Sequence, residues 1–299
     1  MLLRHGKYIV VHAFYIILKK EIAKMLKFRA NTKTEEVLLP MGIYLDQYDE
    51  VCNTCVVKTI DGEVEEYITE KKLRNNGAKM ITRLLATRII RVGEHDYPDG
   101  IGEDKARHMF TEDRDTCVVA IRGLMSDEMN VEAKCPNCGE RFPGTIFMHE
   151  LLEKVKPWEK SKFYDESLPL GVVRFELKDG IWMSGDETKN KDVLCKKGKI
   201  KLPNGVVEER LANLNLNSTG KVNSVLLSAV IDEIENIPKV DEYVVKAMSR
   251  VDREYLTQIV NESKTGPNLL VDLNCDMCGN DFKFMLSFPY FFTVGTGQM

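Results

Sequence analysis

The sequence has few of the features that mark fibrous, disordered or membrane-spanning chains. Only 20 of its 299 residues are glycine and 10 are proline, which excludes collagen-like and low-complexity architectures. The longest apolar run, Tyr8–Leu18, is too short for a bilayer-spanning helix, which needs about 20 residues. Hydrophobic residues make up 43% of the chain, so global disorder is excluded as well. This length favours a globular protein of about two domains.

The chain also lacks a basic excess. It has 42 basic and 46 acidic residues, which gives a net charge of −4. A dedicated nucleic-acid-binding protein normally carries a net positive charge, so nucleic acid is an unlikely partner. Other proteins are the expected partners, without a small-molecule substrate or a membrane.

No export signal is evident near the first residue. Arg4, His5 and Lys7 precede the apolar run, as they would in a signal peptide, but Lys19-Lys20-Glu21 follows where a cleavage site would stand. We therefore expect residues 1–35 to form a helical extension of a cytosolic protein. Met25 would serve equally well as a natural start.

Two of the three Cys-x-x-Cys pairs share more than their spacing. Both read Cys-x-x-Cys-Gly-x-x-Phe, at residues 135–142 and at residues 275–282. The glycine permits the positive φ of a tight knuckle, which points both thiolates at one ion. Tetrahedral zinc takes four such ligands, and one knuckle supplies two. The sequence therefore predicts one Zn²⁺ shared by Cys135, Cys138, Cys275 and Cys278, with each phenylalanine covering the site.

Three other uses of the cysteines remain open. Redox chemistry would require the first cysteine of a pair at a helix N-terminus, and no helix-forming run follows either knuckle. The cysteines could also be reduced and structural, without metal. The third pair, Cys52 and Cys55, lacks the glycine and leads into an expected hairpin with its turn at Asp61-Gly62. It could join Cys135 and Cys138 in a metal site and leave the last pair for another chain.

An internal repeat organises the chain. The two knuckles are 140 residues apart, and Leu84-Leu85 recurs 142 residues later as Leu226-Leu227. Asp113-Arg114 recurs after 139 residues as Asp252-Arg253, and Leu39–Gly42 resembles Leu202–Gly205. Apolar periodicity predicts helices over residues 78–92 and 222–237, ended by Gly93 and Pro238.

These observations predict an α+β fold of two homologous units, each ending in a zinc knuckle. The expected parts are an N-terminal extension (1–35), a first unit (36–150), a β-rich connector (151–199) and a second unit (200–299). The repeated Asp-Arg pair begins a helix in each unit. A helix-capping aspartate and a solvated or ion-paired arginine are favoured over catalysis, because no histidine or nucleophile recurs beside them. We expect no catalytic residue.

The C-terminal segment carries a dense aromatic load. It could pack inside its own unit, or it could dock on a partner, since exposed aromatic clusters mark interfaces. The residues predicted to bind a partner are Phe284, Phe288, Tyr290, Phe291 and Phe292.

The order of these motifs resembles that of the baseplate hub assembly proteins of T-even-like contractile-tailed phages, also labelled tail assembly chaperones. The shared features are Leu-Pro-x-Gly, a Leu-Leu helix, Asp-Arg at a helix start, the knuckle and a terminal Phe-Phe, over most of residues 36–142 and 200–292. This chain carries two copies where one is expected. The resemblance implies contacts with tail or baseplate proteins, no catalysis, and a location in the host cytoplasm and then in the virion. The alternative is a zinc-ribbon protein that binds nucleic acid, and a metal- or thiol-dependent enzyme ranks third.

Overall fold

The computed structural model describes residues 32–69, 76–184, 192–214, 219–287 and 291–292. Helices and strands are mixed within these residues, which confirms the α+β class. The predicted N-terminal extension lies outside them, except for residues 32–35. No helix in the described part of the chain is long and apolar enough to cross a bilayer. We call residues 34–147 the first half and residues 172–285 the second half.

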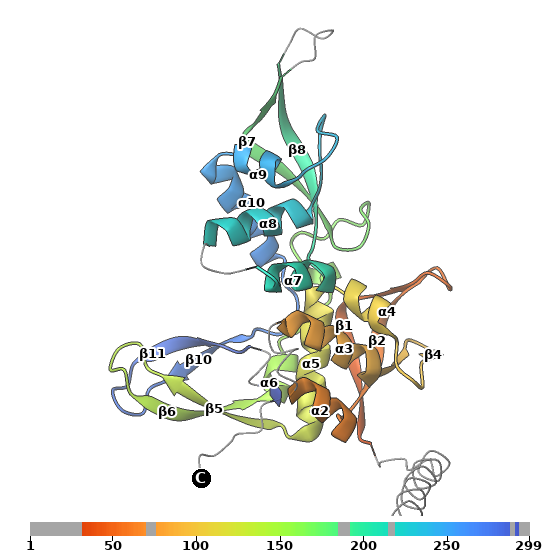
Figure 1. The fold of residues 1–299 in the computed structure, drawn as a ribbon, viewed down its shortest axis with the longest axis vertical. Coiled ribbons are helices and arrows are strands. Elements are labelled where there is room, and N and C mark those ends of the chain that lie inside the picture. Colours follow the sequence, from red (N-terminus) through yellow and green to blue (C-terminus); the bar gives the residue numbers. More distant parts are fainter. Residues whose placement is uncertain (1–31, 70–75, 185–191, 215–218, 288–290, 293–299) are drawn as a thin grey trace, which may run out of the picture. The chain divides into compact units, whose positions relative to one another are not determined.

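The first half begins with a four-stranded antiparallel sheet (Figure 1). Its strands, in spatial order, are β1 (Thr34–Leu45), β2 (Glu50–Lys58), β3 (Ile89–Val92) and β4 (His95–Asp96). The accompanying helices are α2 (Gly62–Thr69), α3 (Gly77–Arg88), α4 (Glu103–His108) and α5 (Thr111–Met125). Helix α5 packs on β1 and β2 through buried side chains such as Cys117, Val118 and Ile121. A hairpin of β5 (Glu128–Lys134) and β6 (Arg141–Phe147) follows.

The second half repeats this order of elements with one strand fewer. Its sheet contains β7 (Val172–Met183), β8 (Val193–Lys201) and β9 (Ile231–Ile234). Its helices are α7 (Gly205–Ala212), α8 (Thr219–Val230), α9 (Glu242–Ala247) and α10 (Arg250–Glu262). Helix α10 packs on β7, and a hairpin of β10 (Leu270–Asn274) and β11 (Asp281–Met285) follows. Between the halves lie α6 (Met148–Leu152) and a 3-10 turn at Trp158–Lys160.

The described residues form three apolar clusters. The largest joins the first sheet to α3 and α5 and takes in Phe291 and Phe292 from the end of the chain, and Val271 of the second half packs against it. The second joins the second sheet to α8 and α10, and it takes in Met41 and Phe110 from the first half. The smallest lies between the two hairpins, which run side by side (Figure 1). Each half thus contributes side chains to a core that belongs mainly to the other.

The two long predicted helices are shorter than expected. Helix α3 ends at Arg88 and α8 ends at Val230, so Gly93 and Pro238 do not terminate them. The residues that follow are strands β3 and β9, which pair with β2 and β8. β-branched isoleucines begin both strands, and they favour extended backbone. In the sequence these isoleucines fit the apolar periodicity of the preceding helix. In the structure they are extended because they pair with a strand that is distant in sequence.

The predicted hairpin turn is wrong, and one part of the predicted repeat does not correspond in the structure. Asp61-Gly62 begins helix α2 instead of a hairpin turn, and the Asp61 carboxylate accepts a hydrogen bond from the Val64 N–H at 3.1 Å. The two Leu-Pro-x-Gly segments occupy different places, since Leu39–Gly42 lies inside β1 whereas Leu202–Gly205 leaves β8 and begins α7. The glycine with the place of Gly42 in the second sheet is Gly180. Both have positive φ, 92° and 81°, within a bulge of the first strand.

The predicted connector contributes to the second sheet. Strand β7 lies wholly within residues 151–199, and the boundary expected between residues 199 and 200 falls inside β8. Strand β8 pairs with β7 on one side and with β9 on the other.

Candidate metal centre

The two knuckles are built in the same way. In each, the N–H of the first cysteine donates to the carbonyl of the residue after the glycine, Glu140 or Asn280, at 2.9 and 3.0 Å. The glycine N–H donates back to the carbonyl of that first cysteine, at 3.0 Å in one knuckle and 2.8 Å in the other. Gly139 and Gly279 have φ of 77° and 68°, a conformation that glycine adopts without a Cβ penalty. The sequence motif therefore fixes both turns locally.

The four sulfur atoms of these knuckles lie together. Every pair among Cys135, Cys138, Cys275 and Cys278 is within 4.8 Å. The Cys135 and Cys278 sulfurs are 3.7 Å apart, and so are those of Cys138 and Cys275. Four thiolates at the ~2.3 Å zinc–sulfur bond length form a tetrahedron with edges of ~3.8 Å. The four cysteines predicted from the sequence to share an ion thus have sulfur atoms close enough to coordinate a single metal ion.

Aromatic side chains line the inner side of this cluster. Cys135 and Cys275 are buried, whereas Cys138 and Cys278 are exposed. Phe142 and Phe282, the final residues of the two motifs, pack edge to face with ring centroids 5.9 Å apart. They belong to the same apolar cluster as Cys135 and Cys275, so they cover the site as predicted.

Hydrogen bonds from the knuckles stabilise negative charge on sulfur. The Asn137 backbone N–H donates to the Cys135 sulfur at 3.4 Å, and the Asn137 side-chain amide donates to the Cys278 sulfur at 3.6 Å. That amide, together with the Asn280 N–H, lowers the pKa of Cys278 to about 6, whereas at Cys138 the Glu140 N–H is outweighed by burial and the neighbouring thiols, which raise the pKa. Metal binding requires thiolates, so these donors favour the form of the cysteine that binds a cation.

The remaining cysteines lie apart from the cluster. The Cys52 thiol donates to a Glu50 carboxylate oxygen at 3.3 Å, and Cys55 faces Cys117 with their sulfurs 3.6 Å apart. All three are buried around the first sheet, and the fourth, Cys195, is buried in the second cluster. None of the four belongs to a group of potential metal ligands in the described part of the chain. The structure therefore pairs Cys135 and Cys138 with Cys275 and Cys278, and not with Cys52 and Cys55.

The geometry also bears on the redox alternative. Each knuckle pair lies in a turn between two strands, with its first cysteine directly after β5 or β10. Neither first cysteine begins a helix, so the helix N-terminus that lowers the thiol pKa in redox pairs is missing from both knuckles.

The C-terminal aromatic residues that the structure describes differ in burial. Phe291 and Phe292 were assigned to partner binding, but both are buried in the largest cluster, which satisfies their apolar surface within the chain. Phe284 is partly buried between that cluster and the hairpin cluster. Phe288 and Tyr290 lie outside the described residues. Intramolecular packing, the alternative considered for this segment, accounts for the last two phenylalanines.

The repeated Asp-Arg pair has a role that the sequence did not reveal. Asp113 does not cap its own helix, because its carboxylate accepts the N–H groups of Met41 and Gly42 at 2.8 and 3.3 Å. Asp252 accepts the N–H groups of Lys178 and Gly180 in the same way, at 2.8 and 2.9 Å. Each aspartate therefore binds the backbone of a bulged strand to the helix that packs on it.

Arg114 links the two halves. Its Nε donates to the Glu208 carboxylate at 2.8 Å, and its Nη1 donates to the Ala106 carbonyl at 2.6 Å. Its side chain is completely buried. The predicted ion-paired arginine is thus present, and its partner lies on α7 in the second half.

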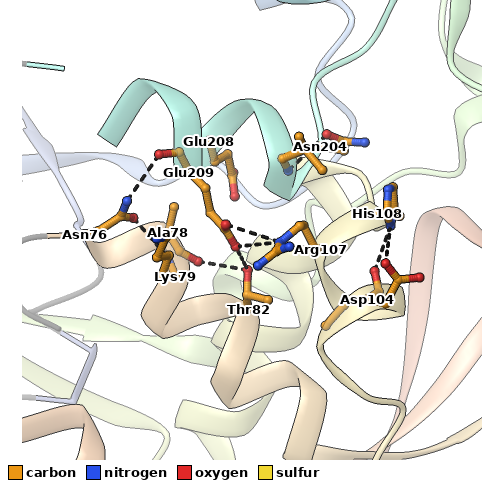
Figure 2. A network of polar contacts seen from close by, with 12 residues as sticks. Asn76, Ala78, Lys79, Thr82, Asp104, Arg107, His108, Asn204, Glu208 and Glu209 are labelled. Atoms are coloured by element: carbon orange, nitrogen blue, oxygen red, sulfur yellow. Dashed lines mark hydrogen bonds and ion pairs between the residues drawn. The ribbon is translucent and has the colours of Figure 1, made fainter. Parts of the chain in front are cut away.

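A polar network continues from this ion pair along α7 (Figure 2). The Glu209 carboxylate accepts from Thr82 Oγ1 at 2.7 Å and pairs with Arg107 Nε at 3.2 Å. Asn76 caps α3 and donates to the Glu209 carbonyl at 3.2 Å. Glu208 and Glu209 belong to a sequence motif that occurs twice: Gly-x-Val-Glu-Glu stands at residues 62–66 and again at residues 205–209.

Comparison with protein-family models, with curated proteins and with solved structures gives no match for this chain. Its class therefore follows from its own geometry. It is an α+β protein in which two β-hairpins, distant in sequence, bring four cysteines close enough to coordinate a metal ion.

Proposed function

We propose that Cys135, Cys138, Cys275 and Cys278 bind one Zn²⁺ and that this ion fastens the two hairpins together. The observation that carries the proposal is the set of four sulfurs within 4.8 Å of one another, two pairs of them at 3.7 Å, close to the ~3.8 Å edge of a tetrahedral zinc site. Soft thiolate ligands in this geometry select zinc or iron over magnesium and calcium. Four protein ligands leave no open coordination position for water, which supports a structural role for the ion instead of a catalytic one.

We also propose that the chain arose by internal duplication. The order of elements in the two halves supports this: a bulged strand pair, a helix running into a third strand, a short helix, a long helix and a knuckle hairpin. The matching contacts of Asp113 and Asp252 with a bulged strand support it too. The second copy would then begin with β7 at Val172, because β7 has the place in the second sheet that β1 has in the first.

The biological role proposed is that of an assembly protein acting through protein–protein contacts. The motif order that resembles baseplate hub assembly proteins supports a contractile phage tail as the setting, with the host cytoplasm and then the virion as location. A metal site closed by protein ligands, which stabilises without reacting, suits such a role. The protein would have no enzymatic activity of its own.

Affinity capture tests this role. The tagged full chain is expressed in cells that are producing contractile-tailed particles, and the captured material is identified by mass spectrometry. Enrichment of baseplate or tail proteins over a tagged unrelated protein is expected. Enrichment of nucleic acid alone, lost as salt is raised, would contradict the proposal and favour the zinc-ribbon alternative.

A further inference from the structure

A small, strongly basic pocket lies where the segment after α6 meets the end of α10. It has a volume of about 270 Å³. Lysines from two distant segments line it: Lys154, Lys156, Lys160, Lys162 and Lys264. We call this space the lysine pocket. The remaining lining residues are Ser161, Glu262, Thr265 and Gly266.

The backbone around the lysine pocket is firmly held. The Lys156 N–H donates to the Thr265 carbonyl at 3.0 Å, which ties the two lining segments together. Trp158 is only 2% exposed and anchors the 3-10 turn in the second cluster. The Lys160 N–H closes this turn with a 3.0 Å bond to the Pro157 carbonyl. The backbone that carries the lysines is therefore held by contacts within the protein and does not depend on a ligand.

Positive charge in the lysine pocket greatly exceeds negative charge. Glu262 is its one lining carboxylate, and it pairs with Lys162 at 2.5 Å. Five lysines and one glutamate leave a net charge of +4, in a chain whose total charge is −4. The C-terminus of α10 contributes only about half a negative charge. A spherical space of 270 Å³ is about 8 Å across, which equals roughly one Debye length at physiological salt, so these charges repel one another.

A second lysine-rich stretch, on β8, has two carboxylates beside it. Lys199 on β8 pairs with Glu233 at 2.7 Å. The nearby Glu235 carboxylate accepts the backbone N–H groups of Lys196 and Lys197 at 2.9 and 3.2 Å. Lysine density in sequence therefore does not by itself create a basic pocket here. The lysine pocket is distinguished by convergence from two segments with a single carboxylate, Glu262, in its lining; of its lysines, Lys264 also interacts with the buried carboxyls of Glu112 and Asp115 behind it.

We propose that the lysine pocket is a binding site for a small phosphate oxyanion carrying at least two negative charges, such as diphosphate. Lysine ammonium groups bind phosphate as point charges with three donors each. The volume is below the range of about 300–1,000 Å³ that holds drug-sized organic ligands. Aromatic residues are missing from the lining, so the pocket offers no stacking surface for a base. The ligand could be free or a terminal phosphate of a larger molecule.

Isothermal titration calorimetry on the full chain tests this at about 0.15 M salt. The probes are diphosphate, inorganic phosphate, and one oligonucleotide with and without a 5′-phosphate. Saturable binding of diphosphate, tighter than that of inorganic phosphate, is expected. Binding of the 5′-phosphorylated oligonucleotide, but not of its unphosphorylated form, would identify a terminal phosphate as the source. Equal binding of both oligonucleotides, or no saturable binding of diphosphate, would overturn the proposal.

A matched pair of variants assigns the binding to this pocket. Lys160→Gln/Lys264→Gln removes one exposed lysine from each lining segment, and Lys197→Gln/Lys201→Gln removes the same charge from exposed positions on β8. Diphosphate should bind about tenfold more weakly to the first variant and with nearly unchanged affinity to the second. Equal weakening in both would show general counterion attraction and overturn the site. The site does not involve the four cysteines, so the metal content of both variants should equal that of the natural chain.

Discussion

The two halves bury the same aspartate but treat the neighbouring arginine differently. Asp113 and Asp252 are both fully buried and both accept the backbone N–H groups of a bulged strand. Arg114 is fully buried as well and pairs with Glu208, whereas Arg253 is half-buried and its Nε has no partner among the described residues. The aspartate contacts, which both halves share, therefore hold a strand to a helix within each half. The arginine contacts differ because only Arg114 binds a helix of the other half, α7.

The largest expected effect comes from removing a ligand from the shared metal site. Cys135→Ser and Cys275→Ser should each lower the free energy of unfolding by several kcal/mol, since structural zinc contributes about 10–16 kcal/mol apparent in small zinc-binding peptides. The two losses should be equal because one ion serves both halves. Urea unfolding measures them, with Cys52→Ser as the control outside the cluster. A large loss from one cysteine only would break the equivalence of the two knuckles.

Replacing the two arginines should show the largest difference in stability between the halves. Arg114→Met leaves the Glu208 carboxylate and the Ala106 carbonyl without their buried partner, and it should cost about 3–5 kcal/mol. Arg253→Met should cost about 1 kcal/mol or less, because no ion pair is lost among the described residues. Urea unfolding of both variants gives the comparison. Equal costs would mean that α7 does not hold the first half through this ion pair.

Replacing either aspartate should have a similar effect on stability in the two halves. Asp113→Asn and Asp252→Asn each weaken hydrogen bonds from backbone N–H groups of a bulged strand, at a cost of about 1–3 kcal/mol. Thermal unfolding of the two variants should give similar losses. If only one of them destabilises the chain, the two aspartates do not perform the same task.

The smallest effect is a pH dependence that belongs to the first half. Burial raises the pKa of Glu112 to about 7, as it does that of the adjacent Asp113, and the residue of α10 that corresponds to Glu112 is the exposed Val251. The folded state then binds more protons than the unfolded state between about pH 4.5 and 7, so this group's contribution to stability falls as pH rises through that window.

Replacing that carboxyl should reduce the pH dependence of stability, and the part due to Asp113 should remain. Glu112→Gln should raise stability at pH 8 by on the order of 1 kcal/mol relative to the natural chain, and by less at pH 5. Glu254→Gln, an exposed position on α10, is the control and should stay within about 0.5 kcal/mol at both pH values. A gain for Glu112→Gln that is the same at pH 5 and pH 8 would contradict the assigned cause.

Local features of this chain were predictable from sequence, and non-local ones were not. The knuckles follow from the motif alone because glycine and cysteine fix the turn within eight residues, for example over Cys135–Phe142. Residues 89–92 looked helical because burial of Ile89 suits either a helical stripe or a strand, and only pairing with β2 decides between them.

The same distinction between local and non-local features applies to the candidate sites. Cys135 and Cys275 were brought together by an explicit argument about half-filled coordination, which needs no knowledge of the fold. The lysine pocket was missed because Lys264 is far in sequence from Lys160, and only the packed chain places them around one space. The contact of Asp113 with β1 was missed for the same reason, since a first-turn aspartate suggests a cap.

The metal-to-chain ratio of the purified natural protein tests the central claim most directly. Elemental analysis of the monomer should find about one zinc ion per chain, bound by cysteines from both halves. A ratio near two would mean that each half holds its own ion, and a ratio near zero would mean that the four sulfurs meet without one. Either result would contradict the account.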